Sequence, residues 1–430
     1  MRIIRGVVCA CSALLVLVPA TAAALLPTSI PEAQGFSSER LGRLDGAMRS
    51  AVGTGMVGGA LTLLARHGRV VEVRSYGDAA PGRPMARDTI FRIYSMTKPI
   101  TGVAMMILFE EGKWKLDDPV AKYIPEFKDM AVATGLDAQG RAIVAPAAHQ
   151  PTMRELMSHT GGFGYGMTQE PGDKLLAASG ARDAHGLPDM IAWMSKVPLL
   201  YQPGTRWQYS MSVDIQGYLV EKLSGMPFGR FLEQRIFAPL RMSDTGFTVP
   251  AGKASRLAAV YHNEADGKLQ PGLPPGRTLA DPAQPPNFES GGGGLFSTLD
   301  DYARFAQMLA NKGVLDGARI LAPATVELMG TNVVPAAVLG DPNNQFYKIF
   351  SPHIGFGLDF QVVMDPRAAG KLEGAGTMSW EGAAGTWFWV DPTNEVVFVG
   401  MVQNFLRAGP AGFDPITRPL VYQALVEPKK

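Results

Sequence analysis

The sequence predicts an α/β lobe joined to an α-helical lobe. Strand-forming segments lie near both ends of the chain, and helix-forming segments lie between them. The 430 residues are 46% hydrophobic and 18% charged, a globular composition that can bury a large core. Because distant strands can pair in one sheet, we expect one domain over residues 25–430, with a helical lobe at roughly 113–284 inserted in the α/β lobe.

Residues 1–24 have the pattern of a secretory signal peptide. Arg2 and Arg5 precede an apolar stretch from Gly6 to Val18, and small residues suited to cleavage follow it. The stretch is short for a membrane span of roughly 20 residues. We therefore expect a cleaved signal, an exported protein in the periplasm or outside the cell, and no stable membrane anchor. A retained membrane anchor is the less favoured alternative.

The cysteines and the net charge exclude several functions. Cys9 and Cys11 both lie inside the signal, so the mature protein would have no disulfide and no cysteine metal site. Removing Arg2 and Arg5 from 40 basic and 39 acidic residues leaves a net charge of −1. A near-neutral chain does not favour nucleic acid or an anionic membrane as a partner.

The spacing of hydrophobic residues predicts the first helix and the first hairpin. Leu41, Leu44, Met48 and Val52 recur at helical spacing behind a serine cap, which predicts an amphipathic helix. Two β-branched runs broken at His67-Gly68 then predict a hairpin, with His67 at the surface.

A second helix is expected from about Met96 to Glu111, followed from Lys113 to about Gln284 by helices separated by Gly- and Pro-rich loops. The most irregular segment, residues 264–294, is too long for a simple connector. It is interpreted either as a loop lining a pocket or as a mobile surface insertion. The remaining expected elements are a capped helix at 297–313, strands within 355–363, 386–392 and 395–403, and a final helix near 415–426.

Ser95 and Lys98 are the first candidates for chemistry. A serine becomes a nucleophile when a base within hydrogen-bond reach removes its proton. Residues three apart on a helix share a face, so Lys98 can reach Ser95. Unpaired N–H groups at the helix start can hold an oxyanion, and Pro99 is tolerated in the first turn. An S-x-x-K spacing also arises by chance with a solvated lysine, although it occurs once in this chain.

Tyr209 is the candidate proton partner of Lys98, because reference pKa values of about 10 for both groups require them to share the proton. One ammonium about 4 Å away at an effective dielectric of about 20 supplies roughly 4 kcal/mol, enough to lower a phenol pKa from about 10 to about 7. The proton then belongs to the pair. Without Ser95 and Lys98, Tyr209 would be interpreted as a buried loop tyrosine.

These motifs resemble those of serine β-lactamase-related hydrolases, specifically the class C-like carboxylesterases called family VIII esterases. The resemblance covers nearly all of the mature chain. Ser95-Met96-Thr97-Lys98 resembles the nucleophile box, Tyr209-Ser210-Met211 the tyrosine box, and Trp380-Glu381-Gly382 in "SWEGAAGT" the third box. "LMSHTGG" at 156–162 and "GGGGLFSTLDDYARF" at 291–305 follow the family's order.

The resemblance implies a β-lactamase/penicillin-binding-protein-like fold, with an antiparallel sheet flanked by helices. It implies that Ser95 forms an acyl-enzyme, that Lys98 and Tyr209 act as general base and acid, and that the N–H groups of Ser95 and Ala383 form the oxyanion hole. Trp380 and Gly382 would border the substrate. The implied partner is a small-molecule ester, with no cofactor and no metal.

Two departures from penicillin-recognising relatives favour neutral, short-chain esters. Those relatives usually have K-T-G or H-T-G in the third box and Y-x-N or S-D-N in the second. Trp380 replaces the cation that would hold a β-lactam carboxylate, and Met211 replaces the amide. An "HTG" at His159 precedes the tyrosine box and is interpreted as a structural loop near the site, and "SDT" at Ser243 as a turn.

Several alternatives remain at this stage. A β-lactamase or D-alanyl-D-alanine peptidase would keep the machinery and change the substrate. An acyl transferase would resolve the same acyl-enzyme with an alcohol, and a non-catalytic protein would stay acylated. No serine lies in a G-x-S-x-G elbow, and the six histidines form no H-E-x-x-H metal motif.

Overall fold

The computed structural model describes residues 25–264, 266–273, 279–340, 351–405 and 412–427. The predicted signal peptide and both cysteines lie outside the described residues. The predicted domain bounds stay a prediction. No helix of the described ranges is both long and apolar enough to span a membrane.

The largest sheet joins the two ends of the described chain. It has eight strands in the order β12-β13-β14-β15-β16-β1-β2-β3, and every pairing within it is antiparallel. The N-terminal β1 pairs with the C-terminal β16, with Thr62 opposite Gly400, which confirms one sheet built from distant segments. The strands are β1 (Gly59–Arg66), β2 (Arg69–Ala80), β3 (Arg83–Pro84), β12 (Ile354–Phe356), β13 (Gln361–Val363), β14 (Met378–Glu381), β15 (Trp387–Asp391) and β16 (Val396–Val402).

The hairpin β1–β2 turns at the predicted dipeptide. His67 and Gly68 have φ angles of 51° and 74°, as a two-residue primed turn requires. His67 is exposed, as expected.

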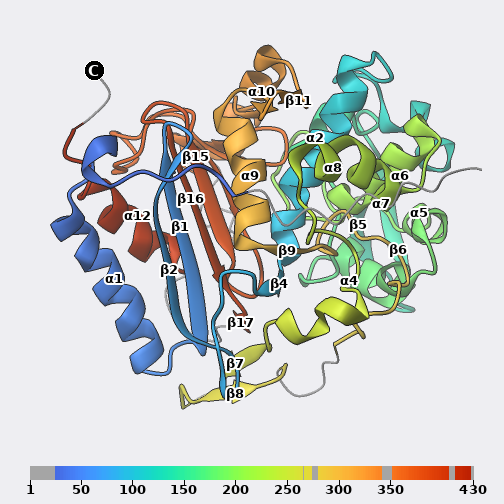
Figure 1. Cartoon of the computed structure of the whole chain (residues 1–430). Helices are drawn as coiled ribbons and strands as arrows, with labels where there is room; N and C mark the ends of the chain where they lie inside the picture. Colours follow the sequence, from blue (N-terminus) through green and yellow to red (C-terminus); the bar gives the residue numbers. More distant parts are fainter. Residues whose placement is uncertain (1–24, 265, 274–278, 341–350, 406–411, 428–430) are drawn as a thin grey trace, which may run out of the picture.

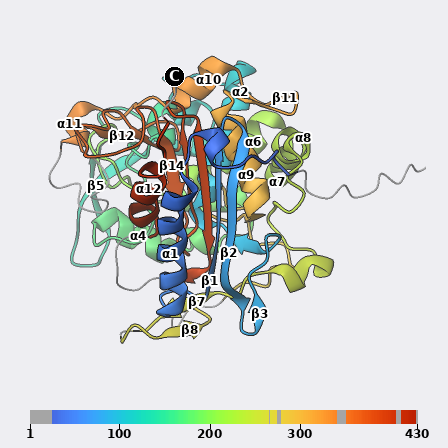
Figure 2. The ribbon, with the colours of Figure 1, turned by 60° about the vertical axis from the view of Figure 1, so that its left-hand side comes forward.

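One face of the sheet is covered by the two terminal helices, α1 (Ser38–Gly53) and α12 (Asp414–Tyr422), at the left of Figure 1 and in front of the sheet in Figure 2. The Ser37 side chain caps α1 by accepting a hydrogen bond from Arg40 N. Trp389 and Phe398 stack below the helices at 4.3 Å between ring centroids. Both predicted terminal helices are therefore confirmed.

The opposite face packs against α9 (Leu299–Ala310), and α2 (Thr97–Glu110) lies beyond α9 in Figure 1 and packs against α6 (Ser212–Ser224). Thr298 caps α9 through a hydrogen bond from Asp301 N, as the sequence predicts. Every residue of α2 from Thr97 to Leu108 is buried. A helix buried on all sides lies between two packed layers, so α2 carries its polar residues into the interior of the protein.

Beyond α2 lie the short helices of the middle region, drawn in green in Figure 1. They are α3 (Met153–Met157), α4 (Pro171–Ser179), α5 (Leu187–Met194), α6 (Ser212–Ser224), α7 (Phe228–Leu232) and α8 (Ala238–Leu240). The description of this region as helical needs a correction. It also contains the hairpin β5 (Ala131–Leu136) and β6 (Ala142–Pro146), whose small and β-branched residues flank a turn bound by Asp137. The strand β7 (Tyr261–Asn263) lies between β8 (Leu269–Pro271) and β17 (Asn404–Phe405) and pairs with both.

The irregular segment 264–294 ends beside α2. Gly291 and Gly292 are buried, and β9 (Phe296–Thr298) pairs with β4 (Ile90–Arg92) immediately afterwards. The end of the segment therefore lies at the predicted site, as the pocket-lining interpretation expects. The other elements are β10 (Val314–Leu315), β11 (Ala318–Arg319), α10 (Pro323–Met329), α11 (Ala336–Leu339), the 3-10 turns Glu32–Gln34, Tyr94–Met96, Val120–Lys122, Pro125–Phe127, Ala181–Asp183 and Ala251–Arg256, and the π turn Glu233–Phe237.

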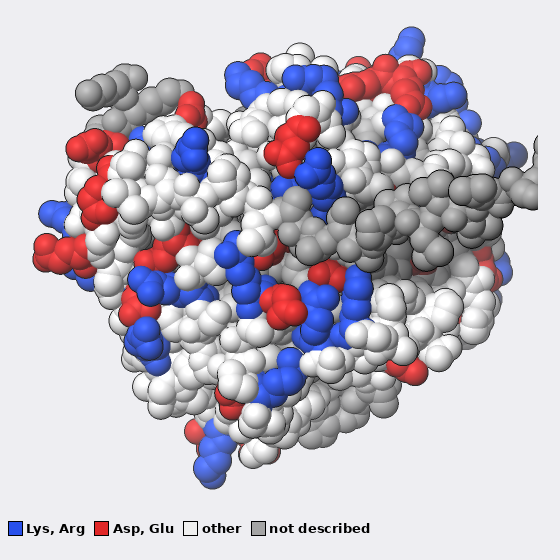
Figure 3. All heavy atoms as spheres, in the orientation of Figure 1, with Lys and Arg blue, Asp and Glu red and all other residues white. Residues whose placement is uncertain are grey.

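On the face shown in Figure 3, Lys and Arg side chains are interspersed with Asp and Glu side chains. This mixture agrees with a formal net charge of +1 for the whole chain.

Candidate active site

Ser95 lies in a tight turn between β4 and α2. Tyr94, immediately before it, has a φ angle of 43°, which is strained for a bulky residue and is held only where the surroundings fix it. The Tyr94 ring packs edge-on against Phe405 at 5.4 Å. Ser95 itself is half-buried. The turn therefore holds the serine at the N-terminus of a buried helix, as the sequence predicts.

The entry to this turn is fixed from the C-terminal part of the chain. Gln403 accepts a hydrogen bond from Arg92 N at 2.7 Å and donates one to Arg92 O at 3.2 Å. Leu295 N donates to Thr97 Oγ1 at 3.2 Å on the other side of the turn. The backbone on both sides of Ser95 is thus fixed by hydrogen bonds to residues that are distant in the sequence.

Lys98 is fully buried one turn along α2. Its Nζ donates to Gly292 O at 2.6 Å and lies 3.4 Å from Ser95 Oγ. The amine is also 4.4 Å from the Tyr209 ring centroid. A buried ammonium requires such partners, so Lys98 is held against the serine and is not a solvated surface lysine.

Tyr209 completes the group from the loop before α6. Its hydroxyl donates to Ser95 Oγ at 2.6 Å. The structure thus brings Ser95, Lys98 and Tyr209 together, although Ser95 and Tyr209 are 114 residues apart. The amine and the phenol converge on the serine oxygen, which is the arrangement that proton exchange with that oxygen needs.

The surroundings do not lower the Tyr209 pKa, contrary to the sequence-based estimate. Burial raises the pKa of Tyr209 above its usual value, and polar contacts with Ser95 and Trp380 lower it only in part. The two-charge estimate for Lys98 and Tyr209 omitted the cost of burying a phenolate. Tyr209 is therefore a neutral hydrogen-bond donor in the resting site at neutral pH.

Aromatic rings enclose Tyr209. The Tyr165 ring stacks on it at 5.3 Å with an interplanar angle of 6°, and Trp207 stacks at 6.1 Å. Tyr165 also lies 5.5 Å from Lys98 Nζ, so it is a site residue that the sequence analysis missed. The phrase "GFGYG" that contains it has no distinctive chemical signal.

His159 of the "HTG" motif lies behind Tyr209. Its ring is 5.2 Å from the Tyr209 ring, and its Nδ1 is 2.9 Å from Ser210 Oγ. Burial lowers the pKa of His159 well below its usual value, so the imidazole is neutral. This geometry supports the interpretation of a structural residue near the site. Ser243 belongs to a turn whose neighbour Asp244 pairs with Arg256 at 2.6 Å.

The third box lies at the end of β14. Trp380 is buried, with its ring 5.7 Å from the Tyr209 ring. A Cβ at Gly382 would lie 2.4 Å from Ile93 O, so the absence of a side chain lets β14 approach the Ser95 turn. Ala383 follows Gly382 and is exposed. The substrate-facing roles of Trp380 and Gly382 and the oxyanion role of Ala383 stay predictions.

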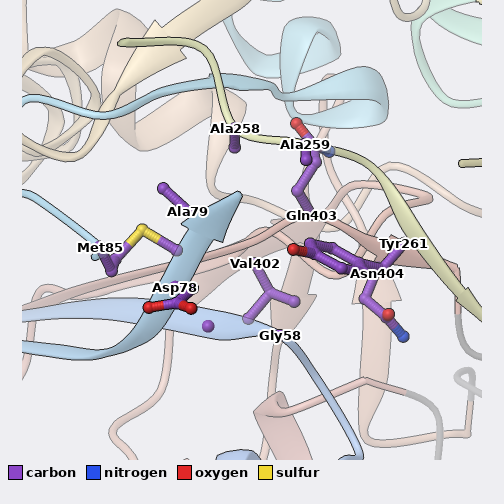
Figure 4. Close-up of a pocket in the computed structure, with 11 residues that line it drawn as sticks. Gly58, Asp78, Ala79, Met85, Ala258, Ala259, Tyr261, Val402, Gln403 and Asn404 are labelled. Carbon is purple, nitrogen blue, oxygen red and sulfur yellow. The ribbon is translucent and has the colours of Figure 1, made fainter. Parts of the chain in front are cut away.

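A separate small cavity lies away from the serine. Figure 4 shows it between the end of β2 and residues 258–261 and 402–404. Its lining includes neither Ser95 nor Tyr209. The described part of the chain has no cluster of three or more His, Cys, Asp or Glu that could hold a metal ion.

Fold and site together define a serine hydrolase, with the nucleophile opening a buried helix beside an antiparallel sheet. Residues 44–422 match the Beta-lactamase family, so the chain belongs to that family. This match confirms the predicted family and its β-lactamase/penicillin-binding-protein-like fold.

Similar curated proteins and solved structures agree with this family and fold. The chain is 36% identical to Protein Rv1367c of Mycobacterium tuberculosis over 375 residues, 84% of this chain and 90% of the relative. It is 32% identical to Esterase EstB of Burkholderia gladioli over 393 residues, 86% and 91% of the two chains. The structure of EstCE1, described as a hydrolase with promiscuous acyltransferase activity, is 27% identical with a TM-score of 0.73, covering 90% of this chain and 99% of that one.

Proposed function

We propose that the protein is an exported carboxylesterase that hydrolyses short-chain, uncharged esters through an acyl-Ser95 intermediate. The observation that carries this proposal is the convergence of Tyr209 Oη at 2.6 Å and Lys98 Nζ at 3.4 Å on Ser95 Oγ. The similarity to Esterase EstB supports the ester as substrate class. Export rests on the first 24 residues alone.

The reaction has two steps. Once the Lys98–Tyr209 pair has lost one proton to solvent, it takes the proton of Ser95 as its Oγ attacks the ester carbonyl, and the N–H groups of Ser95 and Ala383 hold the oxyanion. The pair then protonates the leaving alcohol as the C–O bond breaks. A water attacks the acyl-serine by the same route, releasing the acid and restoring Ser95.

The side chains around the serine favour an uncharged substrate. Trp380 presents a buried indole where penicillin-recognising relatives have a cation, and Met211 is a buried thioether where they have an amide. Neither group stabilises a β-lactam carboxylate or its side-chain carbonyl. A β-lactamase or D-alanyl-D-alanine peptidase activity is therefore the weaker alternative.

An acyl transferase is the second candidate. EstCE1 combines hydrolysis with acyl transfer, according to its description, and an alcohol can replace water on the same acyl-enzyme. The product ratio with and without added alcohol separates the two activities.

The test is hydrolysis of p-nitrophenyl butyrate by wild type, Ser95→Ala and the control Ser50→Ala, with nitrocefin in parallel. Ser50 is exposed on α1, so its variant should match wild type. Ser95→Ala should lose activity by a factor on the order of 10⁴ or more. Equal ester activity in Ser95→Ala would exclude the mechanism. Efficient nitrocefin turnover would contradict the proposed ester substrate and favour a β-lactam.

A further inference from the structure

The segment Ser290–Gly292, here called the Gly strap, ties α2 to α6 beside the catalytic lysine. From α2, Thr101 Oγ1 donates to Gly291 O at 2.9 Å and Lys98 Nζ donates to Gly292 O at 2.6 Å. Lys98 and Thr101 are three residues apart, so both project from one helix face. The strap therefore supplies the backbone carbonyl that fixes the position of the Lys98 amine.

The two glycines of the strap have no room for side chains. A Cβ at Gly291 would lie 2.4 Å from Val213 O, and a Cβ at Gly292 would lie 2.6 Å from Asp214 Oδ2. Both distances are shorter than real Cβ atoms show. The strap backbone is thus pressed against the first turn of α6, and its position depends on that turn.

Asp214 holds the strap from the α6 side. This residue is 2% exposed, and its Oδ1 accepts hydrogen bonds from Ser290 Oγ at 2.5 Å and from Gly292 N at 3.0 Å. Gly292 consequently binds the Asp214 carboxylate through its N–H and the Lys98 ammonium through its C=O. Hydrogen bonds to charged groups are the stronger class, so this one residue couples the two charges.

We propose that Asp214 is a positioning residue for catalysis, which fixes Lys98 against Ser95 through the Gly strap and balances the ammonium with its negative charge. This role rests on the proposed esterase function. Asp214 does not touch Ser95 Oγ, and it acts through Gly292.

Other ionisable groups also surround the Lys98–Tyr209 pair. Behind Tyr209, His159 is kept neutral by burial. Across α2, burial raises the pKa of Asp359 well above its usual value, and a hydrogen bond from Gln216 and the charge of Lys98 oppose this shift. The charges of Asp214 and of Glu381 at the end of β14 raise the pKa of Tyr209, after burial as the main cause. Of the two charges, Asp214 is the one bonded to the strap.

The roles of geometry and charge can be separated with two variants. Asp214→Asn keeps the side-chain shape and removes the charge, whereas Ser290→Ala removes one bond of the strap and keeps the charge. Both should lower kcat, by about 10- to 100-fold for Asp214→Asn and less for Ser290→Ala. KM for p-nitrophenyl butyrate should change little in either.

The pH profile provides the decisive readout. The charge of Asp214 raises the pKa of Tyr209, so without this charge the phenol loses its proton more easily, and the acid limb of kcat/KM should move to lower pH by about one unit. Ser290→Ala should leave this limb in place. A merely structural defect would lower kcat without moving the limb.

Wild type and Ser95→Ala are measured in parallel. If wild type lacks esterase activity or Ser95→Ala retains it, the proposed function fails. If both behave as expected and Asp214→Asn has an unshifted acid limb, the inference about Asp214 is overturned. If Asp214→Asn does not fold, wild-type kcat in both Ser290→Ala and Thr101→Val overturns it, and lowered kcat in both supports it.

Discussion

The two walls of the candidate active site are held in different ways. The wall that carries Lys98 is buried and is joined by several contacts from α2, α6 and the Gly strap. The second wall is the loop 164–168, which carries Tyr165 beside Lys98 and Tyr209 and depends largely on one carboxylate. Asp173, fully buried in α4, accepts four backbone N–H bonds, from Tyr165 at 2.8 Å, Gly166 at 2.6 Å, Met167 at 2.8 Å and Thr168 at 2.5 Å.

This difference indicates that the two walls have different roles in catalysis. The reacting groups are anchored from several elements, so their geometry tolerates little movement. The loop wall is held mainly by the Asp173 carboxylate, with one further hydrogen bond from Met211 N to Gly164 O at 2.9 Å, and it exposes Met167. Its shape can therefore change more readily than the position of Ser95 or Lys98. We expect changes in the first wall to affect kcat and changes in the second to affect KM.

The largest effect is expected for Tyr209→Phe. The phenol is a neutral donor to Ser95 Oγ at 2.6 Å, and removing it takes away one member of the proton-transfer pair. We expect kcat to fall by about 10²- to 10⁴-fold, with little loss of stability because the aromatic ring remains between Tyr165 and Trp207.

The control for this variant is Tyr201→Phe, whose ring lies outside the group on Ser95 and contacts Arg206 at 4.4 Å. Activity should stay near wild type there. A Tyr209→Phe enzyme with near-normal kcat would show that Lys98 works without the phenol. The proton transfer to and from Ser95 would then depend on Lys98 alone.

Local parts of this site could be predicted from sequence. Ser95 and Lys98 lie on one helical turn, so their spacing determines their contact, and the β1–β2 hairpin follows from its own turn residues. Asp214, by contrast, meets Gly292 across 78 positions. Asp and Gly are common residue types, and the sequence pattern does not indicate such a pair.

The effect of burial on the Tyr209 pKa also could not be predicted from the neighbouring sequence. The direction of the Tyr209 pKa shift depends on the rings of Tyr165, Trp207 and Trp380, which come from three separate segments. The hairpin β5–β6 was missed because short alternating runs in a Gly- and Pro-rich region resemble loops. Such features depend on tertiary packing, which the chain order does not show.

An intermediate effect is expected for Asp173→Asn. An amide offers one acceptor oxygen where two oxygens now receive four N–H groups, so the loop should loosen and Tyr165 should lose its fixed stacking on Tyr209. We expect KM for p-nitrophenyl butyrate to rise about 3- to 10-fold with kcat within about threefold of wild type. The free energy of unfolding should fall by about 1–3 kcal/mol.

The matched control is Asp183→Asn, which changes an exposed carboxylate in the nearby 3-10 turn. Steady-state kinetics and chemical unfolding of both variants provide the comparison. A loss of kcat at constant KM in Asp173→Asn would contradict the division between the two walls.

The smallest effect is expected for Trp380→Phe, which keeps an aromatic ring and removes the indole N–H. The contact with Trp380 lowers the pKa of Tyr209, so its removal should raise that pKa. The Lys98–Tyr209 pair would then lose its proton at higher pH. The acid limb of kcat/KM should therefore move upward by a few tenths of a unit, opposite in direction to Asp214→Asn. At pH 7 the rate should fall by less than about threefold. Measuring both limbs in one buffer series tests the sign directly, and a downward shift in Trp380→Phe would show that the indole does not act on the phenol.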